Sequence, residues 1–145
     1  MRLVIAGKGP LDGALREEVR GLGISDRVVL TGPLASSEIA SWMRRAEMLC
    51  MTSRNEGLPN VILEAQACGL PVLATDVGGI RELVDESWKG SLVPLDDGEA
   101  WVEAATRMLD NPADRHRIAA VGQKRTWKAA ADEVARVLEL ATKDL

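Results

Sequence analysis

Residues 53–71, with the sequence SRNEGLPNVILEAQACGLP, lie between two short apolar segments and decide the fold of this chain. The segment before them (48–52) and the one after them (72–75) have the length and composition of buried strands. Between them the sequence predicts a helix, because Pro59 suits its first turn and Gly69 suits the left-handed residue just past its end. A strand, loop, helix and strand in this order close as a right-handed crossover in a parallel sheet.

Two carboxylates of this unit are candidates for a functional site. Glu56 precedes the helix N-terminus, where unpaired N–H groups and the positive end of the helix dipole favour an anion. Glu56 could equally satisfy those N–H groups itself as a capping residue. Glu64 lies inside the helix in an apolar run, so it belongs either on the solvent face or at a specific site near the sheet's upper rim. The spacing alone leaves these alternatives open.

Strands and helices alternate along the whole chain. The pattern predicts strands at 2–6, 28–31, 48–52, 72–75 and 91–94, and a last helix that begins at about Trp127. We therefore expect a single domain over residues 1–145, with an α/β, Rossmann-like, doubly wound parallel sheet and flanking helices.

Ligands of such sheets bind beyond the carboxyl ends of the strands. Three loops of the required kind meet there, at 7–10, 31–35 and 53–60. Their glycines permit close backbone approach, a helix N-terminus can take negative charge, and a carboxylate one turn along can accept from ribose hydroxyls. From its residues, the chain is predicted to be a nucleotide-binding α/β domain.

Composition argues against several other classes of protein. The net charge is −4, and the chain has four Trp but no Phe or Tyr, which argues against a nucleic-acid partner. His116 is the sole histidine, and no Cys/His spacing is typical of a metal site. Cys50 and Cys68 lie in apolar contexts and are predicted to be buried free thiols of a cytoplasmic protein. No apolar run is long enough to span a bilayer.

A longer pattern resembles a known enzyme family. Glu56 and Glu64, seven residues apart, are followed by AQACGLPVLATDVGGIRELV at 65–84, and this run resembles the signature of glycosyltransferase family 4. That family comprises retaining, nucleotide-sugar-dependent enzymes of the GT-B fold. The segments LVIAGKGP (3–10) and VVLTG (28–32) resemble the second and third strands of the family's C-terminal domain, and Trp127 also fits.

The resemblance implies a role for each matching residue. Glu56 would be catalytic and donor-binding, because it would hold hydroxyls of the donor sugar and help to stabilise charge near the anomeric carbon. Glu64 would bind the ribose hydroxyls. The other donor-binding residues would be Gly57, Leu58 and Asn60 through their backbone N–H groups, and Pro59 through its geometry. The main chain that would face the base comprises Thr31, Gly32, Pro33 and Leu34.

The resemblance also implies what the protein would bind. The substrate would be a nucleotide-diphosphate sugar, with no cofactor and no metal, since the sequence has no Asp-x-Asp motif. The family's basic diphosphate clamp, its N-terminal acceptor domain and its first strand–helix unit have no counterpart in this sequence. The chain is therefore similar to the donor half of a hexosyltransferase of cell-surface polysaccharide or glycolipid synthesis, whose full enzyme could associate peripherally with the inner membrane face.

Two functions of different classes follow. The first is part of a hexosyltransferase, active only with the acceptor domain or a separate subunit that supplies it. The second is a stand-alone, non-catalytic domain that binds a nucleotide or pairs with a partner. A GT-B sugar-nucleotide epimerase fits the run from Glu56 to Glu64 less well.

The missing unit leads to an expectation about the sheet. In the strand order 3-2-1-4-5-6 the first strand sits in the middle. Without it, residues 2–6 and 48–52 would flank an empty position, and buried unpaired N–H and C=O groups cost about 1–3 kcal/mol each. Three outcomes would avoid or reflect this cost: 2–6 pairs directly with 48–52, a second chain inserts a strand, or the chain is molten and aggregates. In a well-ordered monomer we expect 2–6 to pair directly with 48–52.

Overall fold

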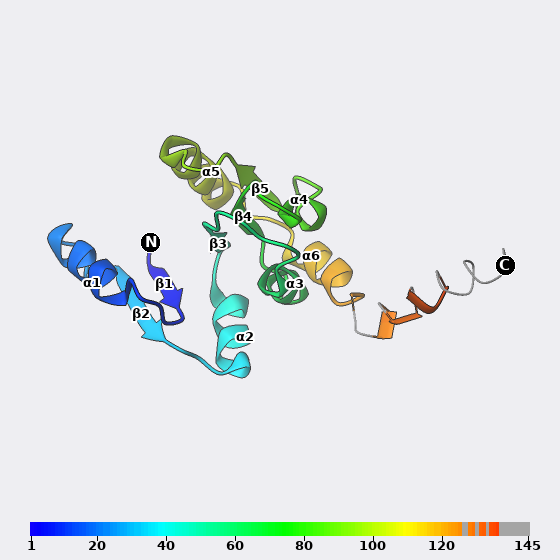
Figure 1. The fold of residues 1–145 in the computed structure, drawn as a ribbon. Helices are drawn as coiled ribbons and strands as arrows, with labels where there is room; N and C mark the ends of the chain where they lie inside the picture. The colour runs from blue at the N-terminus through cyan, green and yellow to red at the C-terminus, as the bar shows by residue number, and fades with distance from the viewer. Residues whose placement is uncertain (126–127, 130, 133, 137–145) are drawn as a thin grey trace. The chain divides into compact units, whose positions relative to one another are not determined.

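The computed structural model describes residues 1–125, 128–129, 131–132 and 134–136 (Figure 1). It groups the chain into two compact units, Met1–Trp42 and Met43–Leu145, which are described separately. Trp127, at which the last helix was predicted to begin, lies outside the described residues, as do residues 137–145.

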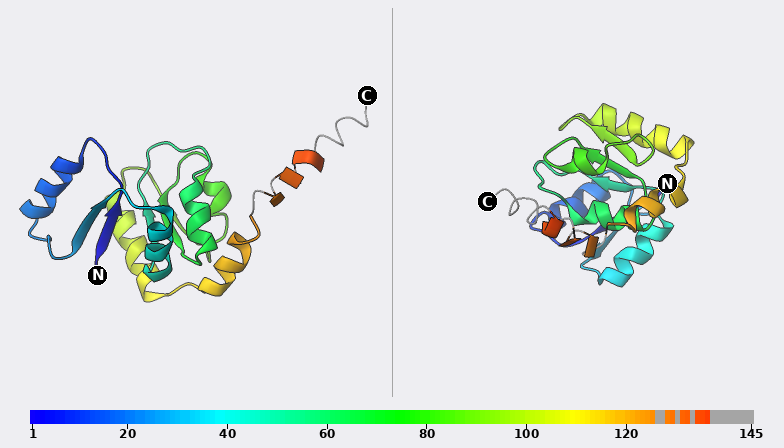
Figure 2. Two further views of the ribbon diagram at one scale, coloured as in Figure 1. Left: turned by 90° about the horizontal axis from the view of Figure 1, so that it is seen from below. Right: turned by 90° about the vertical axis from the view of Figure 1, so that its right-hand side faces the viewer.

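The first unit contains a strand–helix–strand motif. Its elements are β1 (Leu3–Ala6), α1 (Asp12–Gly21) and β2 (Val28–Gly32). The two strands are parallel neighbours, as the left view of Figure 2 shows, and Leu3 lies opposite Val28. The register shifts by one residue between Ile5 and Ala6, so that Ala6 lies opposite Gly32. The strands predicted at 2–6 and 28–31 are thus present within a residue at each end.

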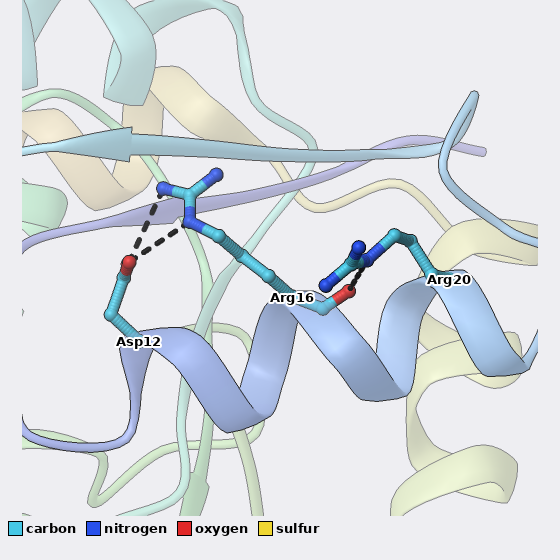
Figure 3. A network of polar contacts seen from close by, with 3 residues as sticks. All are labelled: Asp12, Arg16 and Arg20. Atoms are coloured by element: carbon cyan, nitrogen blue, oxygen red, sulfur yellow. Dashed lines mark hydrogen bonds and ion pairs between the residues drawn. The ribbon is translucent and has the colours of Figure 1, made fainter.

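Helix α1 carries a polar network along one side (Figure 3). Arg16 Nε donates a hydrogen bond to Asp12 Oδ2 at 2.9 Å, and Arg20 Nε donates to the carbonyl of Arg16 at 3.3 Å. The Arg16 guanidinium stabilises the ionised carboxylate and so lowers the pKa of Asp12 below its usual value. Asp12 also lies in the first turn, where a negative charge is favourable to the helix dipole.

The second unit is built on a three-stranded parallel sheet. The strands are β3 (Leu49–Met51), β4 (Val72–Thr75) and β5 (Gly90–Val93), in the order β3-β4-β5. Met51 lies opposite Ala74, and Thr75 lies opposite Val93. Every residue of β4 is buried, as expected of the central strand in a sheet covered on both faces.

Helices cover both faces of this sheet. They are α3 (Asn60–Ala67), α4 (Ile80–Leu83), α5 (Gly98–Asp110) and α6 (Arg115–Gly122). In Figures 1 and 2, α5 lies on one side of the sheet, and α3 and α6 lie on the other. A core cluster of Leu73, Val93 and Ala104 joins α5 to the sheet. Helix α2 (Ser36–Arg45) spans the boundary between the two units.

The predicted ends of helix α3 are close to the observed ones. Pro59 is the N-cap, one residue before the first helical position, with extended backbone (φ −72°, ψ 117°). Gly69 has φ +71°, the left-handed conformation that the sequence predicted there. The Gly69 N–H donates to Gln66 O and the Leu70 N–H donates to Ala65 O, both at 2.9 Å, which closes the helix end.

The expected pairing of 2–6 with 48–52 is wrong. Among the described residues, β1 pairs with β2 and β3 pairs with β4, in two separate sheets. The expectation rested on the cost of burying unpaired backbone groups. Each of these strands instead pairs with a strand of its own unit, which satisfies backbone groups along one of its edges.

The two cysteines are free thiols, as predicted, but the prediction that both are buried is wrong for Cys50. Cys50 is exposed, whereas its neighbours Leu49 and Met51 are half-buried. Successive side chains of a strand point to opposite faces, so Cys50 points away from the face that these two neighbours share. Cys68 is half-buried at the end of α3.

The contact between α3 and α6 gives a stability prediction. A Cβ atom at Gly122 would lie 2.4 Å from the carbonyl carbon of Gln66, which is backbone and cannot move aside. Gly122→Ala should therefore lower the free energy of unfolding by about 1–3 kcal/mol, as overpacking generally does. Gly98→Ala is the matched control, because a Cβ there meets open space. Urea denaturation of both variants is the measurement, and equal midpoints would contradict the packing argument.

Candidate functional site

Three loops of the second unit lie at one edge of its sheet. Because β3, β4 and β5 are parallel, their carboxyl ends share that edge. Residues 52–59 follow β3, residues 76–79 follow β4, and residues 94–97 follow β5. The donor-binding residues implied for this unit lie in the first of these loops and in the helix after it.

Hydrogen bonds join the first two loops. Thr75 Oγ1, at the end of β4, donates to the carbonyl oxygen of Ser53. The Gly79 N–H donates to the carbonyl oxygen of Gly57 at 3.0 Å. The loop before α3 is thus attached to the neighbouring strand at one point and to the next loop at another.

Two glycines permit the loops to approach this closely. Gly78 has φ +53°, and a Cβ atom on it would lie 1.8 Å from the carbonyl oxygen of Glu56. A Cβ atom on Gly79 would lie 2.4 Å from the carbonyl oxygen of Gly57. This glycine pair belongs to the run that resembles the family and was predicted to be structural, and it supports the main chain of Glu56 and Gly57.

One ion pair joins two of these loops, and a second joins the loop after β4 to helix α4. Arg54 contacts Asp96 with both terminal nitrogens, at 2.7 and 3.1 Å, and so links the loop after β3 to the loop after β5. Asp96 has φ +61°, unusual for a residue other than glycine. Arg81 pairs with Asp76. Both arginines are mostly exposed, so each pair by itself adds little to stability.

Glu56 is half-buried, and its carboxylate is oriented by its own loop. Ser53 Oγ donates to Glu56 Oε1 at 2.7 Å. The first N–H groups of any α-helix lack an intrahelical acceptor, and the N-cap Pro59 supplies no side-chain bond to those of α3. The carboxylate of Glu56 accepts a hydrogen bond from Ser53, and this contact does not favour the alternative in which Glu56 caps helix α3.

The other predicted residues of this unit differ in exposure. Glu64 is exposed on α3, and Gly57 and Asn60 are also exposed. Leu58 is 53% exposed, high for a large apolar side chain, whereas Pro59 is buried. A Cβ atom on Gly57 would meet no other atom within 4 Å, so the space above its backbone is open. This arrangement offers two carboxylates and a helix N-terminus to a ligand with hydroxyl and anionic groups.

The base-facing segment proposed from the resemblance lies in the first unit and is described by itself. Thr31 and Gly32 end β2, and Pro33 and Leu34 follow it. The carbonyl oxygen of Gly32 accepts from the Gly7 N–H and from Thr31 Oγ1, both at 2.9 Å. The bond from the Gly7 N–H, together with a bond from Thr31 Oγ1 to the carbonyl oxygen of Ile5 at 3.4 Å, holds the end of β2 beside the end of β1.

Other features of the second unit lie away from these loops. A cavity of about 150 Å³ is lined by Pro71, Trp88 and Gly90 among others, at the opposite edge of the sheet, where β4 and β5 begin. Within the described ranges, no three or more His, Cys, Asp or Glu side chains cluster as they would around a metal ion. No helix in that part of the chain is long and apolar enough to cross a membrane.

Sequence reasoning missed the residues that support the loop. Ser53, Thr75 and the pair Arg54–Asp96 were not among the candidates, although they bond to or within the loop that carries Glu56. The available signal was the position of Ser53 and Thr75, hydroxyl residues at the carboxyl ends of two predicted neighbouring strands. The bond between Arg54 and Asp96 joins residues 42 positions apart and has no local signal.

Comparison with known protein families assigns the chain to one of them. A family described as "Glycosyl transferases group 1" matches residues 1–111, about three quarters of the sequence. The chain belongs to this family. Its described structure is the parallel-sheet, Rossmann-like α/β fold of GT-B glycosyltransferases, as the sequence predicted.

Curated relatives of this group 1 glycosyltransferase chain are much longer than it is. It is 39% identical to the D-inositol 3-phosphate glycosyltransferase of Streptosporangium roseum, in a match that covers 85% of this chain and 29% of the relative. It is 37% identical to the 2-deoxystreptamine N-acetyl-D-glucosaminyltransferase of Streptomyces fradiae, with 93% and 32% covered. The chain spans about a third of the length of these relatives.

A solved structure shows the same fold. Anabaena Alr3699/HepE, crystallised in complex with UDP, matches with a TM-score of 0.84 over 96% of this chain and 41% of that chain. The sequence identity is 22%, so this likeness concerns the fold.

The contact of Gly78 with the loop gives a second stability prediction. Gly78→Ala would place a methyl group against the carbonyl of Glu56 and force alanine into a left-handed conformation. We expect it to lower the free energy of unfolding by about 1–3 kcal/mol in urea denaturation. Gly57→Ala, in open space in the same pair of loops, should stay within about 0.5 kcal/mol of wild type. Equal losses in the two variants would show that the close approach does not matter.

Proposed function

We propose that this chain is the donor-binding domain of a retaining glycosyltransferase of family 4. It would bind a nucleotide-diphosphate sugar, and the full enzyme would transfer the hexosyl group to an acceptor, in the synthesis of a cell-surface polysaccharide or glycolipid. One observation carries the proposal. Glu56 and Glu64 lie in the loop and the helix that follow β3 at the carboxyl edge of the sheet, where ligands of such folds bind.

The proposed roles follow the chemistry of each group. The carboxylate of Glu56 would accept from hydroxyls of the donor sugar and stabilise positive charge near the anomeric carbon. Glu64 would accept from the ribose hydroxyls. The backbone N–H groups of Gly57, Leu58 and Asn60 would meet sugar and diphosphate oxygens, aided by the positive end of α3.

The remaining residues would shape the site. Pro59, buried and without an N–H, would fix where α3 begins. The main chain from Thr31 to Leu34 would face the base. We propose no metal and no cofactor, because the sequence contains no Asp-x-Asp motif and the charge of the donor would be met by N–H groups.

The partners of the domain are part of the proposal. Because the chain spans about a third of its curated relatives, an acceptor domain or a separate subunit would supply the other wall of the cleft. The full enzyme would act in the cytoplasm, with peripheral association at the inner membrane face. The two relatives described above bear transferase names, which favours transfer over the epimerase alternative.

Nucleotide binding gives the first test. Hydrogen bonds to a charged group contribute about 1.5–3 kcal/mol when the pair is desolvated, so Glu64→Ala should weaken the binding of a nucleotide tenfold or more. Calorimetry with UDP, GDP and ADP on the wild-type chain and the variant measures this. Glu103→Ala is the matched control, since Glu103 is also an exposed helical glutamate but lies on α5. Unchanged affinity in Glu64→Ala would assign Glu64 a structural role, and no nucleotide binding by wild type would contradict the proposed function.

The second test concerns chemistry. This 145-residue chain alone should transfer no sugar, because orientation of donor and acceptor in one closed cleft supplies about 7–11 kcal/mol of barrier lowering. Slow hydrolysis of the donor is the most we expect from purified protein. The assay follows release of the nucleoside diphosphate with and without sugar acceptors. Robust transfer would overturn the interpretation of this chain as the donor half of an enzyme.

A further inference from the structure

We propose that Ser53 and Thr75 are positioning residues that hold the carboxylate of Glu56 in its ligand-binding orientation. This inference rests on the proposed function, in which Glu56 holds hydroxyls of the donor sugar. Neither residue is proposed to touch the donor. Both act through Glu56, by two hydrogen bonds in series that connect its carboxylate to the central strand of the sheet.

The first bond fixes the side chain of Glu56. Ser53 Oγ donates to Glu56 Oε1 at 2.7 Å, within one loop and three residues apart. An ionised carboxylate has about four acceptor positions on its two oxygens. Ser53 occupies one of them, so the bond restrains the rotation of the side chain and leaves acceptor positions for sugar hydroxyls.

The second bond fixes Ser53. Thr75 is the last residue of β4, its side chain is buried with 2% exposed, and its Oγ1 donates to the carbonyl oxygen of Ser53. Thr75 is itself held in the sheet opposite Val93 of β5. The start of the loop is therefore tied to the most buried strand of the unit.

The backbone of Glu56 is held independently of these bonds. Its carbonyl lies against Gly78, and the carbonyl of Gly57 accepts from the Gly79 N–H. With the main chain supported there, the remaining freedom of Glu56 is in its side chain, which is what Ser53 restrains. A carboxylate already held in its bound orientation loses less conformational entropy when a ligand binds.

A purely structural role for Ser53 gives a different expectation. If the bond only stabilised the loop, its loss would weaken the binding of the nucleotide and of the nucleotide sugar by the same factor. A positioning role acts on the sugar alone, because the nucleotide would be held by Glu64 and by N–H groups. The ratio of the two affinities therefore separates the alternatives.

The binding experiment compares the affinity for each nucleoside diphosphate with the affinity for a corresponding nucleotide sugar. Calorimetry on the full chain uses UDP and UDP-glucose, GDP and GDP-mannose, and ADP and ADP-glucose, and the pair bound most tightly by wild type is followed. The gain is the affinity for the nucleotide sugar divided by the affinity for the nucleoside diphosphate. We expect Ser53→Ala to reduce this gain by about 3- to 10-fold, close to the effect of Glu56→Ala. The affinity for the nucleoside diphosphate itself should stay within about twofold of wild type. Ser53→Thr keeps the hydroxyl and should retain the gain.

Thr75→Val and Ser87→Ala complete the set. Thr75→Val removes the donor to Ser53 with little change of volume and should reduce the gain as Ser53→Ala does, whereas Thr75→Ser should restore it. Ser87→Ala is the matched control, since Ser87 lines the cavity at the opposite edge of the sheet, and should leave the gain unchanged. If Glu56→Ala loses the gain and Ser53→Ala keeps it, the positioning role is overturned.

A structural readout keeps this inference separate from the proposed function. Crystal structures of wild type and Ser53→Ala without ligand should show the Glu56 carboxylate displaced in the variant, with the Gly79–Gly57 bond intact. A carboxylate that stays in place overturns the inference, whatever the chain binds. A displaced carboxylate in a protein that binds no nucleotide sugar supports the positioning of Glu56 and contradicts the proposed function.

Discussion

The close backbone approach of Gly78 and Gly79 to Glu56 and Gly57 is the constraint on which the candidate site depends. Two carbonyl groups occupy the space where side chains at these glycines would otherwise be, so the loop after β3 can lie this close to the loop after β4. This placement supports the main chain of Glu56 and Gly57, and the hydroxyl of Ser53 then orients the carboxylate of Glu56. The candidate loop is thus supported by a parallel sheet, the usual arrangement in α/β folds.

Features with a local cause were predictable from the sequence. The helix between β3 and β4 was placed within a residue at its N-terminus by Pro59, and Gly69 was assigned its left-handed conformation, because proline and glycine have backbone restrictions that need no tertiary partner. The five strands followed from apolar runs between turn residues. Glu56 and Glu64 lie in the loop and the helix where the sequence placed them, and their binding roles stay predictions.

Features with a distant cause were not predictable. The bond from Thr75 to Ser53 and the pair of Arg54 with Asp96 depend on which loops meet at the sheet edge, and no spacing in the chain encodes those distances. The expected pairing of 2–6 with 48–52 failed for a related reason. The argument applied one strand order to the whole chain, whereas β1 pairs with β2 in one sheet and β3 pairs with β4 in another.

The ion pairs at the carboxyl edge have a further consequence for recognition. Arg54 and Arg81 are each engaged by an aspartate, and Glu56 and Glu64 add two more carboxylates, so two cations face four anions and the set carries an excess of two negative charges. Long-range attraction from these side chains cannot guide a diphosphate towards this edge. A diphosphate bound at this edge would have to be met by short-range N–H groups or by cations outside this set.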